Sequence, residues 1–322
     1  MAGGVSNYVC ELTESQAARL HRLLEERGWE FGAAPYARWR AKKDKVNVVA
    51  YESGKTTVQG KGTDEVVQYL IEPEILQEAR LGYEAVLAEQ ATPEMFEPHA
   101  GIDESGKGDY FGPLVIAACY TDAASARILL DAGVADSKTI KSDAKMMALD
   151  ALIRKTCAGQ FAVVAIGPET YNRLYDSFGN LNRLLAWGHG RALEILLELV
   201  PDCPRAIDDQ FAASKHVVER ALQERGRKIL LDQHTKAEAD IAVAAASILA
   251  RAEFVRGMKR VGESVSLLLP KGGGPAVKSL ARKIAEAGGI TALGKVAKLH
   301  FKITQEALGT GGTGTTLREF GN

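Results

Sequence analysis

Residues 101–118 read Gly-Ile-Asp-Glu-Ser-Gly-Lys-Gly-Asp-Tyr-Phe-Gly-Pro-Leu-Val-Ile-Ala-Ala. Two adjacent acids, Asp103 and Glu104, stand directly before a glycine-rich segment at 106–108. The apolar run from 114 to 119 predicts a buried strand. Carboxylates at the end of a strand are hard oxygen ligands that suit Mg²⁺ or Mn²⁺. Glycines let the backbone come close to a sugar or a phosphodiester. The stretch therefore predicts a metal-dependent nuclease site.

Two other interpretations of this stretch were weighed against the nuclease site. The pattern from Gly101 to Lys107 fits most of a phosphate-binding P-loop. However, position 108 is Gly, so the Ser or Thr that holds Mg²⁺ in a P-loop is missing, and two acids would lie inside the phosphate cradle. A surface turn rich in Gly and Asp is the simpler alternative.

Composition indicates an ordinary globular protein. The chain has 322 residues, enough for two domains, and is 46% apolar and 25% charged. No apolar run is long enough for a transmembrane helix, and residues 1–8 lack the pattern of a signal peptide. The four cysteines show no Cys-x-x-Cys spacing, which predicts reduced thiols in a cytoplasmic protein. No membrane association and no obligatory protein partner are expected, and we expect a monomer.

The first 76 residues predict a small α+β domain with the order β-α-β-β-β-α. Thr13 and Gln16 form a capping box at the start of the first helix. Net charge is −1 overall, but residues 38–61 carry seven basic residues against two acidic ones. A basic face of this kind binds phosphates without sequence preference. The residues predicted to contact substrate are Tyr36, Arg38, Arg40 and Lys42. The aromatic residues Trp39 and Tyr51 either stack on the substrate or pack against the helices.

The chain resembles the ribonuclease HII/HIII family, and the likeness extends over most of its length. Residues 101–115 match the family signature, in which Ser105 and the Gly-Lys-Gly segment favour the HIII branch. Further matches are Asp136-Ser137-Lys138, Ala186-Trp187-Gly188-His189, Asp209-Gln210-Phe211, Lys236-Ala237-Glu238 and 293–301. The resemblance implies an α/β protein with a ribonuclease H-like catalytic domain. It also implies an N-terminal domain similar in fold to the TATA-binding protein.

The predicted domains are residues 1–76 for substrate binding, a helical linker at 77–99, the catalytic domain at 100–308 and a disordered tail at 309–322. The tail is predicted from its low hydrophobicity.

Four acids are predicted to be both catalytic residues and metal ligands. Asp103 and Glu104 come from the opening stretch, and Asp209 ends a predicted strand. Because strand side chains alternate, only one of Asp208 and Asp209 is expected to serve, and the resemblance favours Asp209. The resemblance also assigns Glu238 as the fourth acid. Asp240 is its rival, although it also suits a helix N-cap.

The resemblance implies an endoribonuclease that cuts the RNA strand of RNA/DNA hybrids and leaves 5′-phosphate and 3′-hydroxyl ends. The expected cofactor is Mg²⁺ or Mn²⁺, with two ions. The residues expected to bind substrate next to the acids are Ser105, Gly106, Lys107, Gly108 and Lys138. Lys138 is equally compatible with an exposed lysine beside a helix cap. His189 is expected to pack rather than to catalyse. The alternative function is a protein that binds hybrids without cutting them.

Overall fold

The computed structural model describes residues 7–78, 84–135, 137, 140, 142–209, 220–222, 224–234 and 237–309. The side chains of residues 84–87, 209, 234 and 238 lie outside this description. The chain divides into two compact units, residues 1–91 and residues 92–322. Each unit is described by itself below.

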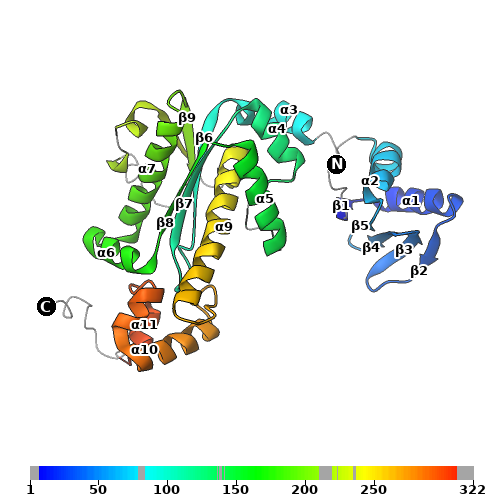
Figure 1. Ribbon diagram of the computed structural model, residues 1–322. Helices are drawn as coiled ribbons and strands as arrows, with labels where there is room; N and C mark the ends of the chain where they lie inside the picture. The colour runs from blue at the N-terminus through cyan, green and yellow to red at the C-terminus, as the bar shows by residue number, and fades with distance from the viewer. Residues whose placement is uncertain are drawn as a thin grey trace. The chain divides into compact units, whose positions relative to one another are not determined.

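The N-terminal unit is a five-stranded antiparallel sheet with α1 (Glu14–Glu26) and η1 (Val67–Leu76) packed on one face (Figure 1). The strand order is β1-β5-β4-β3-β2. The strands are β1 (Asn7–Glu11), β2 (Glu30–Gly32), β3 (Ala37–Lys43), β4 (Val46–Tyr51) and β5 (Lys55–Gly60). The helices are α1 (Glu14–Glu26), α2 (Thr63–Val66), the π-helix η1 (Val67–Leu76) and α3 (Glu84–Ala91).

The predicted capping box at the start of α1 is confirmed. Thr13 accepts a hydrogen bond from the backbone N–H of Gln16, and the Gln16 side chain accepts one from the N–H of Thr13. Two elements differ from the prediction. The three-residue strand β2 was not anticipated, because three residues are too few to show a periodic pattern. The second helix continues past residue 70 as η1, which contains Pro73, a residue that an α-helix does not accommodate.

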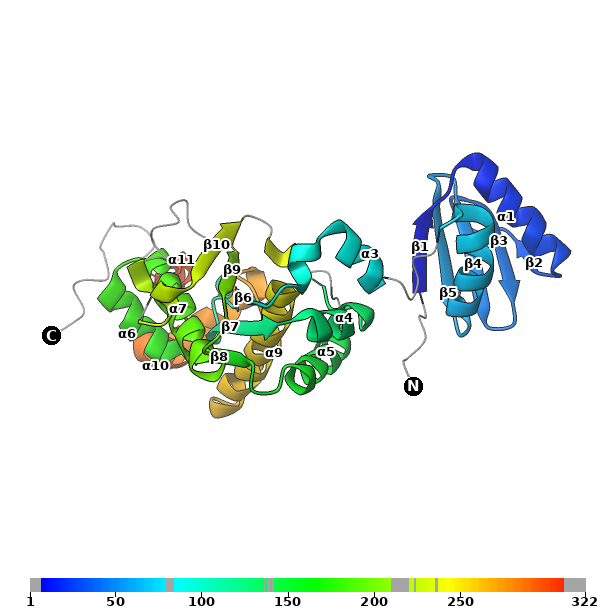
Figure 2. The same cartoon turned by 90° about the horizontal axis from the view of Figure 1, so that it is seen from above.

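The larger unit is built on a mixed sheet with the order β10-β9-β6-β7-β8 (Figures 1 and 2). The strands are β6 (His99–Ser105), β7 (Leu114–Thr121), β8 (Phe161–Ile166), β9 (Arg205–Asp209) and β10 (Leu230–His234). The pairs β10–β9 and β9–β6 are parallel, whereas β6–β7 and β7–β8 are antiparallel. The parallel pairing brings the carboxyl ends of β6 and β9 to the same edge of the sheet.

Two long helices cover the two faces of this sheet. Helix α7 (Leu181–Leu199) packs on one face and α9 (Ile241–Ser264) on the other (Figure 1). The helix predicted over 241–251 extends to Ser264, and every residue from 241 to 250 is buried against the sheet. The small side chains in this run allow the helix to lie close to the strands. The remaining elements are η2 (Pro93–Phe96), α4 (Ala123–Asp131), α5 (Asp143–Thr156), α6 (Pro168–Phe178), η4 (Gly226–Lys228), η5 (Ala237–Ala239), α10 (Pro275–Val296) and α11 (Lys302–Ala307).

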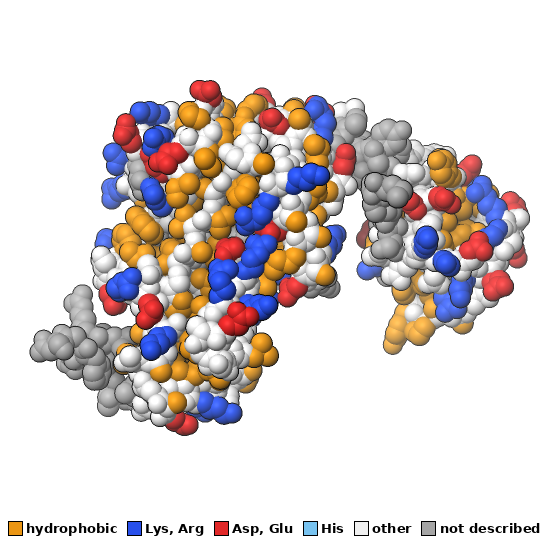
Figure 3. Space-filling view, in the orientation of Figure 1, with side chains coloured by type: hydrophobic (Ala, Val, Ile, Leu, Met, Phe, Trp, Pro, Cys, Tyr) orange, Lys and Arg blue, Asp and Glu red, His pale blue; other side chains and the backbone are white. Residues whose placement is uncertain are grey.

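Lys and Arg side chains gather over α5 and α9 in the view of Figure 3, interspersed with acids. The buried Asp150 of α5 binds Arg154 on its own helix and Arg256 on α9. Arg260 pairs with Glu253 on the same helix. The Asp150–Arg256 pair joins α5 to α9, and all three arginines named here are paired with acids of the protein itself.

All four cysteines, Cys10, Cys119, Cys157 and Cys203, are free thiols and all are buried. Within the part of the chain that the structure describes, no helix is long and apolar enough to cross a membrane.

Candidate active site

The two acids of the opening stretch lie near the end of β6, which is the central strand of the sheet. Ile102 of β6 pairs with Asp208 of the parallel strand β9. Side chains of paired positions share a face, so Glu104 and Asp208 belong to the face covered by α7. Asp103 belongs to the opposite face, which α9 covers. Asp103 and Glu104 therefore lie on opposite faces of the sheet, near the carboxyl end of its central strand.

His189 of α7 joins Glu104 to Asp208. Its Nδ1 lies 2.7 Å from a carboxylate oxygen of Asp208, and its Nε2 lies 3.1 Å from Oε2 of Glu104. His189 and Asp208 are fully buried. Burial would lower the pKa of His189, but the charge and hydrogen bond of Asp208, together with Glu104, raise it to about 10. The ring is therefore a cation held between two carboxylates.

Glu104 remains an anion because of these neighbours. Burial alone would raise its pKa, but the hydrogen bond and charge of His189, with a contribution from Lys107, bring it below its usual value. Lys107 Nζ lies 3.4 Å from Oε1 of Glu104. The carboxylate is thus oriented from two sides, by a ring on α7 and by a lysine of the glycine-rich segment.

On the other face, Asp103 is linked to the Asp136-Ser137-Lys138 motif through α9. A hydrogen bond joins Asp103 to the side chain of Ser247, and the Ser247 hydroxyl lies 2.6 Å from that of Ser137. Arg251 of α9 also donates to the backbone carbonyl of Ser137. Ser137 of this motif is therefore linked to Asp103 through Ser247, whereas Asp136 and Lys138 lie outside the described residues.

Asp103 carries a raised pKa. Burial is the largest cause, and the adjacent charge of Glu104 adds to it. Two close carboxylates in a buried setting repel each other, and a cation between them removes that penalty. Their oxygens are the donors that Mg²⁺ and Mn²⁺ prefer. Among the described side chains no group of three acids, histidines or cysteines is close enough to hold a metal ion, so a complete site needs ligands beyond this pair.

The other two predicted ligands, Asp209 and Glu238, have side chains outside the description. The backbone nevertheless carries information on both choices. Asp208 is engaged with His189 on the α7 face. Asp240 is the N-cap of α9, accepting from the N–H groups of residues 242 and 243, and its carboxylate also binds His99. Asp208 and Asp240 thus both have structural partners.

The glycine-rich segment connects β6 to β7, and its two glycines differ in what surrounds them. Gly106 has φ +88°, and a Cβ there would lie 2.4 Å from the carbonyl oxygen of Pro113. The fold itself therefore requires glycine at 106. Gly108 has no atom within 4 Å of where its Cβ would be. The chain leaves free space at 108, open to a molecule approaching from outside.

The predicted basic residues of the N-terminal unit lie on β3 and its preceding turn. Ala41 is buried on the helix side of the sheet, so its neighbours Arg40 and Lys42 belong to the opposite face, where both are exposed. Tyr36 is 86% exposed. Arg38 differs, because it pairs with Glu14 at 3.0 Å.

Trp39 and Tyr51, which were predicted either to stack on the substrate or to pack against the helices, lie in different surroundings. Trp39 lies at the helix side, with its ring edge-on to His21 and Phe31. It therefore packs in the core cluster of this unit rather than facing a substrate. Tyr51 ends β4 and is half-buried.

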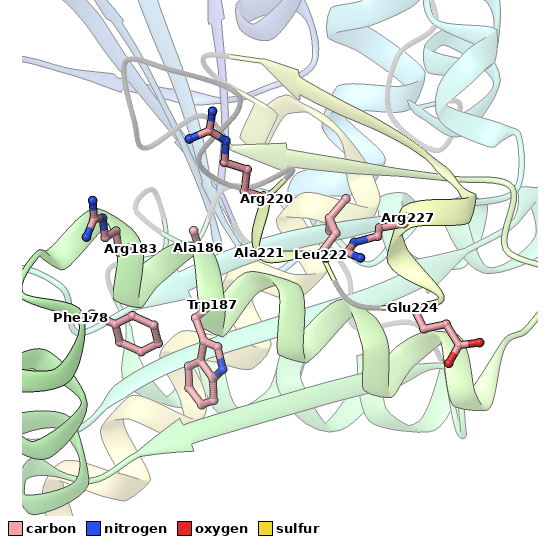
Figure 4. A pocket seen from close by; sticks show the side chains of 9 residues that line it. All are labelled: Phe178, Arg183, Ala186, Trp187, Arg220, Ala221, Leu222, Glu224 and Arg227. Atoms are coloured by element: carbon pink, nitrogen blue, oxygen red, sulfur yellow. The ribbon is translucent and has the colours of Figure 1, made fainter.

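A separate hollow of about 870 Å³ lies beside α7 (Figure 4). The described residues that line it are Phe178, Arg183, Ala186, Trp187, Arg220, Ala221, Leu222, Glu224 and Arg227. The rings of Phe178 and Trp187 lie 6.0 Å apart. Trp187 and His189 are two positions apart on the helix and point to different sides, so this hollow is distinct from the acid site.

Sequence reasoning missed two residues that orient the acids. His189 was expected only to pack, and Ser247 was treated only as a member of an alanine-rich helix. His189 is 85 residues from Glu104 in the sequence, and Ser247 is 144 residues from Asp103. No local sequence pattern predicts contacts over such separations. One feature of the sequence could have revealed them. A histidine and a serine lie on the apolar faces of helices that are expected to cover the sheet, and buried polar side chains need hydrogen-bond partners.

Comparisons with known proteins identify the family of this chain. A family model described as Ribonuclease HII matches residues 100–304, and one described as Domain of unknown function (DUF3378) matches residues 7–80. Ribonuclease HIII of Chlamydia pneumoniae is 39% identical over 300 residues, which are 93% of this chain and 97% of that protein. Ribonuclease HIII of Chlamydia trachomatis serovar L2 is 38% identical over 307 residues, covering 95% and 99% of the two chains.

Among solved structures, the crystal structure of Bst-RNase HIII in complex with Mn²⁺ aligns with a TM-score of 0.62 and 31% identity. The alignment covers 94% of this chain and 98% of that one. It confirms the predicted ribonuclease H-like α/β fold with an added N-terminal sheet domain. The chain therefore belongs to the ribonuclease HII family, and its full-length relatives are ribonucleases HIII.

Proposed function

We propose that this protein is an endoribonuclease that cuts the RNA strand of RNA/DNA hybrids and leaves 5′-phosphate and 3′-hydroxyl ends. The observation that carries the proposal is the pair Asp103 and Glu104 at the end of β6, oriented from both faces of the sheet and followed at once by a loop with free space at Gly108. The full-length ribonuclease HIII relatives support the same reaction.

The proposed ligand set is Asp103, Glu104, Asp209 and Glu238, with two Mg²⁺ or Mn²⁺ ions. Bound divalent ions lower the pKa of water and neutralise charge at a phosphate. The protein's own part is to hold the carboxylates: Ser247 fixes Asp103, and His189 fixes Glu104. Removal of a group that orients a metal-binding carboxylate lowers activity about 10- to 100-fold. The Mn²⁺ complex of Bst-RNase HIII supports a divalent ion in this site.

Recognition of RNA requires a group that senses the 2′-hydroxyl. We assign this to the backbone of Gly106, Lys107 and Gly108, helped by Ser105 at the end of β6. The open space at Gly108 supports the assignment, because a sugar can approach the backbone there without meeting a side chain. Lys138 is assigned to a phosphate of the duplex, which is supported by the position of its neighbour Ser137 beside Asp103.

The N-terminal unit is proposed to hold the hybrid through Tyr36, Arg38, Arg40 and Lys42. Residues 1–76 then bind substrate, residues 77–99 link, and residues 100–308 cut. The four buried free thiols support the reducing environment of the cytoplasm as the location. We further propose that the chain works as a monomer without an obligatory protein partner.

A direct test uses a labelled RNA/DNA hybrid with the purified protein and Mg²⁺ or Mn²⁺. The wild type is expected to cut the RNA strand, and Asp103→Asn to lose roughly 100-fold or more in rate, because it loses a charged ligand. Asp131→Asn, at an exposed position at the end of α4, is the matched control and should cut normally.

The same assay addresses the alternative of a protein that binds hybrids without cutting them. A non-catalytic binder gains nothing from carboxylates near a polyanion, so Asp103→Asn should then bind the hybrid as well as or better than wild type, and neither should cut. Absence of cleavage by the wild type with both metals would refute the nuclease proposal.

A further inference from the structure

The side chain of Lys298 is fully buried, and its ammonium group donates to three carbonyls of one short segment. Nζ lies 2.8 Å from the carbonyl oxygen of Asp109, 2.9 Å from that of Gly112 and 3.4 Å from that of Phe111. The backbone N–H of Lys298 donates to the carbonyl of Tyr110 at 2.9 Å. This single residue therefore binds every carbonyl from position 109 to position 112.

Burying a lysine side chain in a protein core is energetically unfavourable. The ion pairs found among the described residues do not include Lys298. Burial lowers the pKa of its ammonium to about 7, although the charge of Asp109 acts in the opposite direction. Taking an ammonium group out of water is unfavourable unless hydrogen bonds and nearby charges compensate for the lost hydration. A leucine or methionine would pack here without that penalty. The three N–H donors of the ammonium match the three carbonyls, which explains why a lysine occupies the position.

The segment that Lys298 holds is the direct continuation of the glycine-rich loop. The N–H of Asp109 donates to the carbonyl of Gly106 at 3.3 Å, which closes the turn over 106–109. Residues 110 and 112 are also held through their N–H groups, by Gly272 at 3.0 Å and by Val296 at 2.9 Å. The carbonyls of this segment depend on Lys298. Without it, three buried acceptors lose their donors.

We propose that Lys298 is a positioning residue for recognition of the RNA strand. By fixing the peptide groups of 109–112, it sets the place and direction of the backbone at Gly106 to Gly108, and it does so without touching substrate. This inference rests on the proposed function, which assigns those glycines to the 2′-hydroxyl. Its effect belongs to substrate binding and to discrimination between ribose and deoxyribose, and not to the chemical step.

The test compares Lys298→Met with Lys283→Met, an exposed lysine of α10. Both variants and the wild type are assayed on an RNA/DNA hybrid and on the same hybrid with one 2′-deoxynucleotide in the RNA strand at the cleavage position. For Lys298→Met we expect KM on the hybrid to rise roughly 10-fold or more with little change in kcat, since a loop displaced by about 1 Å loses its fit. The rate penalty for the deoxynucleotide should shrink by a similar factor. Hydrogen exchange should speed up at the amides of 106–112, and Lys283→Met should behave as the wild type.

The outcomes separate this inference from the function on which it rests. If the wild type cuts and discriminates, and Lys298→Met keeps both the KM and the deoxynucleotide penalty, then Lys298 is structural only and the inference is overturned. If the wild type does not cut the hybrid, the proposed function itself fails. Should Lys298→Met not fold, Lys298→Gln, which keeps two N–H donors on a side chain that is one atom shorter, is measured in the same way and judged by the same criteria.

Discussion

At the scale of single residues, the two glycines beside the acids serve different purposes. Gly106 is dictated by the protein, because of its positive φ and the nearby carbonyl of Pro113. Among the described residues, no atom lies within 4 Å of the position that a Cβ at Gly108 would take. The proposed contact of the substrate with this backbone gives a reason for glycine at 108.

This difference predicts opposite outcomes for two alanine substitutions. Gly108→Ala should leave the free energy of unfolding within about 0.5 kcal/mol of wild type and lower kcat/KM on a hybrid roughly 10- to 100-fold, because the added methyl group blocks the substrate. Gly106→Ala should lose roughly 1–3 kcal/mol of stability from backbone strain. Denaturant unfolding and cleavage assays on both variants measure the two effects. Equal loss of stability in the two variants would contradict this assignment.

At the scale of elements, the segment after α10 brings His300 into an aromatic stack. Its ring lies 4.4 Å from that of Tyr175, and a hydrogen bond of 3.3 Å joins its Nδ1 to the Tyr171 hydroxyl. Burial, with the nearby charge of Lys298, lowers the pKa of His300 to about 4. The folded protein therefore keeps this ring neutral at pH values where the unfolded chain takes up a proton.

The sign of the resulting pH dependence follows directly. Between pH 6.5 and pH 4 the unfolded state binds more protons than the folded state at His300, so the free energy of unfolding falls as the pH is lowered through this window. His300→Phe should remove this contribution, about 1 kcal/mol after allowing for solvent at a half-buried ring. Urea unfolding at pH 7.5 and pH 4.5 checks it. An unchanged difference between the two pH values in the variant would show that His300 does not carry the effect.

The elements also show how far the sequence alone could lead. The acids and glycines of 101–118 and the capping box of α1 were predictable, because each rests on a local pattern. The register between β6 and β9 was not, and the choice of Asp209 over Asp208 stays a prediction. The roles of His189, Ser247 and Lys298 depend on contacts across the fold. Lys298 was the hardest of these to predict, because no sequence pattern indicates a lysine buried in the core.

At the scale of the whole molecule, the proposed function assigns binding to the N-terminal unit and cutting to the larger unit. If the open face of the N-terminal sheet grips the duplex through phosphates, deletion of residues 1–76 should raise KM on a hybrid and leave kcat close to that of the full chain. The dependence of binding on salt should fall with it. For the single variants Arg40→Ala and Lys42→Ala, the slope of log K against log salt should decrease by about 1 each.

A control for the salt experiment lies on the other side of the same unit. Arg19 of α1 is paired with Glu74 at 3.5 Å, so Arg19→Ala removes the same charge from the helix side. It should leave the slope unchanged. A deletion that preserves both KM and the salt slope would refute the binding role of residues 1–76.

Because all four native thiols are buried, the motion of the two units can be measured with fluorophores attached to newly introduced cysteines. A maleimide dye added to the folded chain finds all four native thiols buried. New cysteines at Tyr69 in one unit and at Leu268 in the other, which are 72% and 96% exposed, would take up donor and acceptor fluorophores selectively. Energy transfer between them would then report, in solution and molecule by molecule, whether the units draw together when a hybrid arrives.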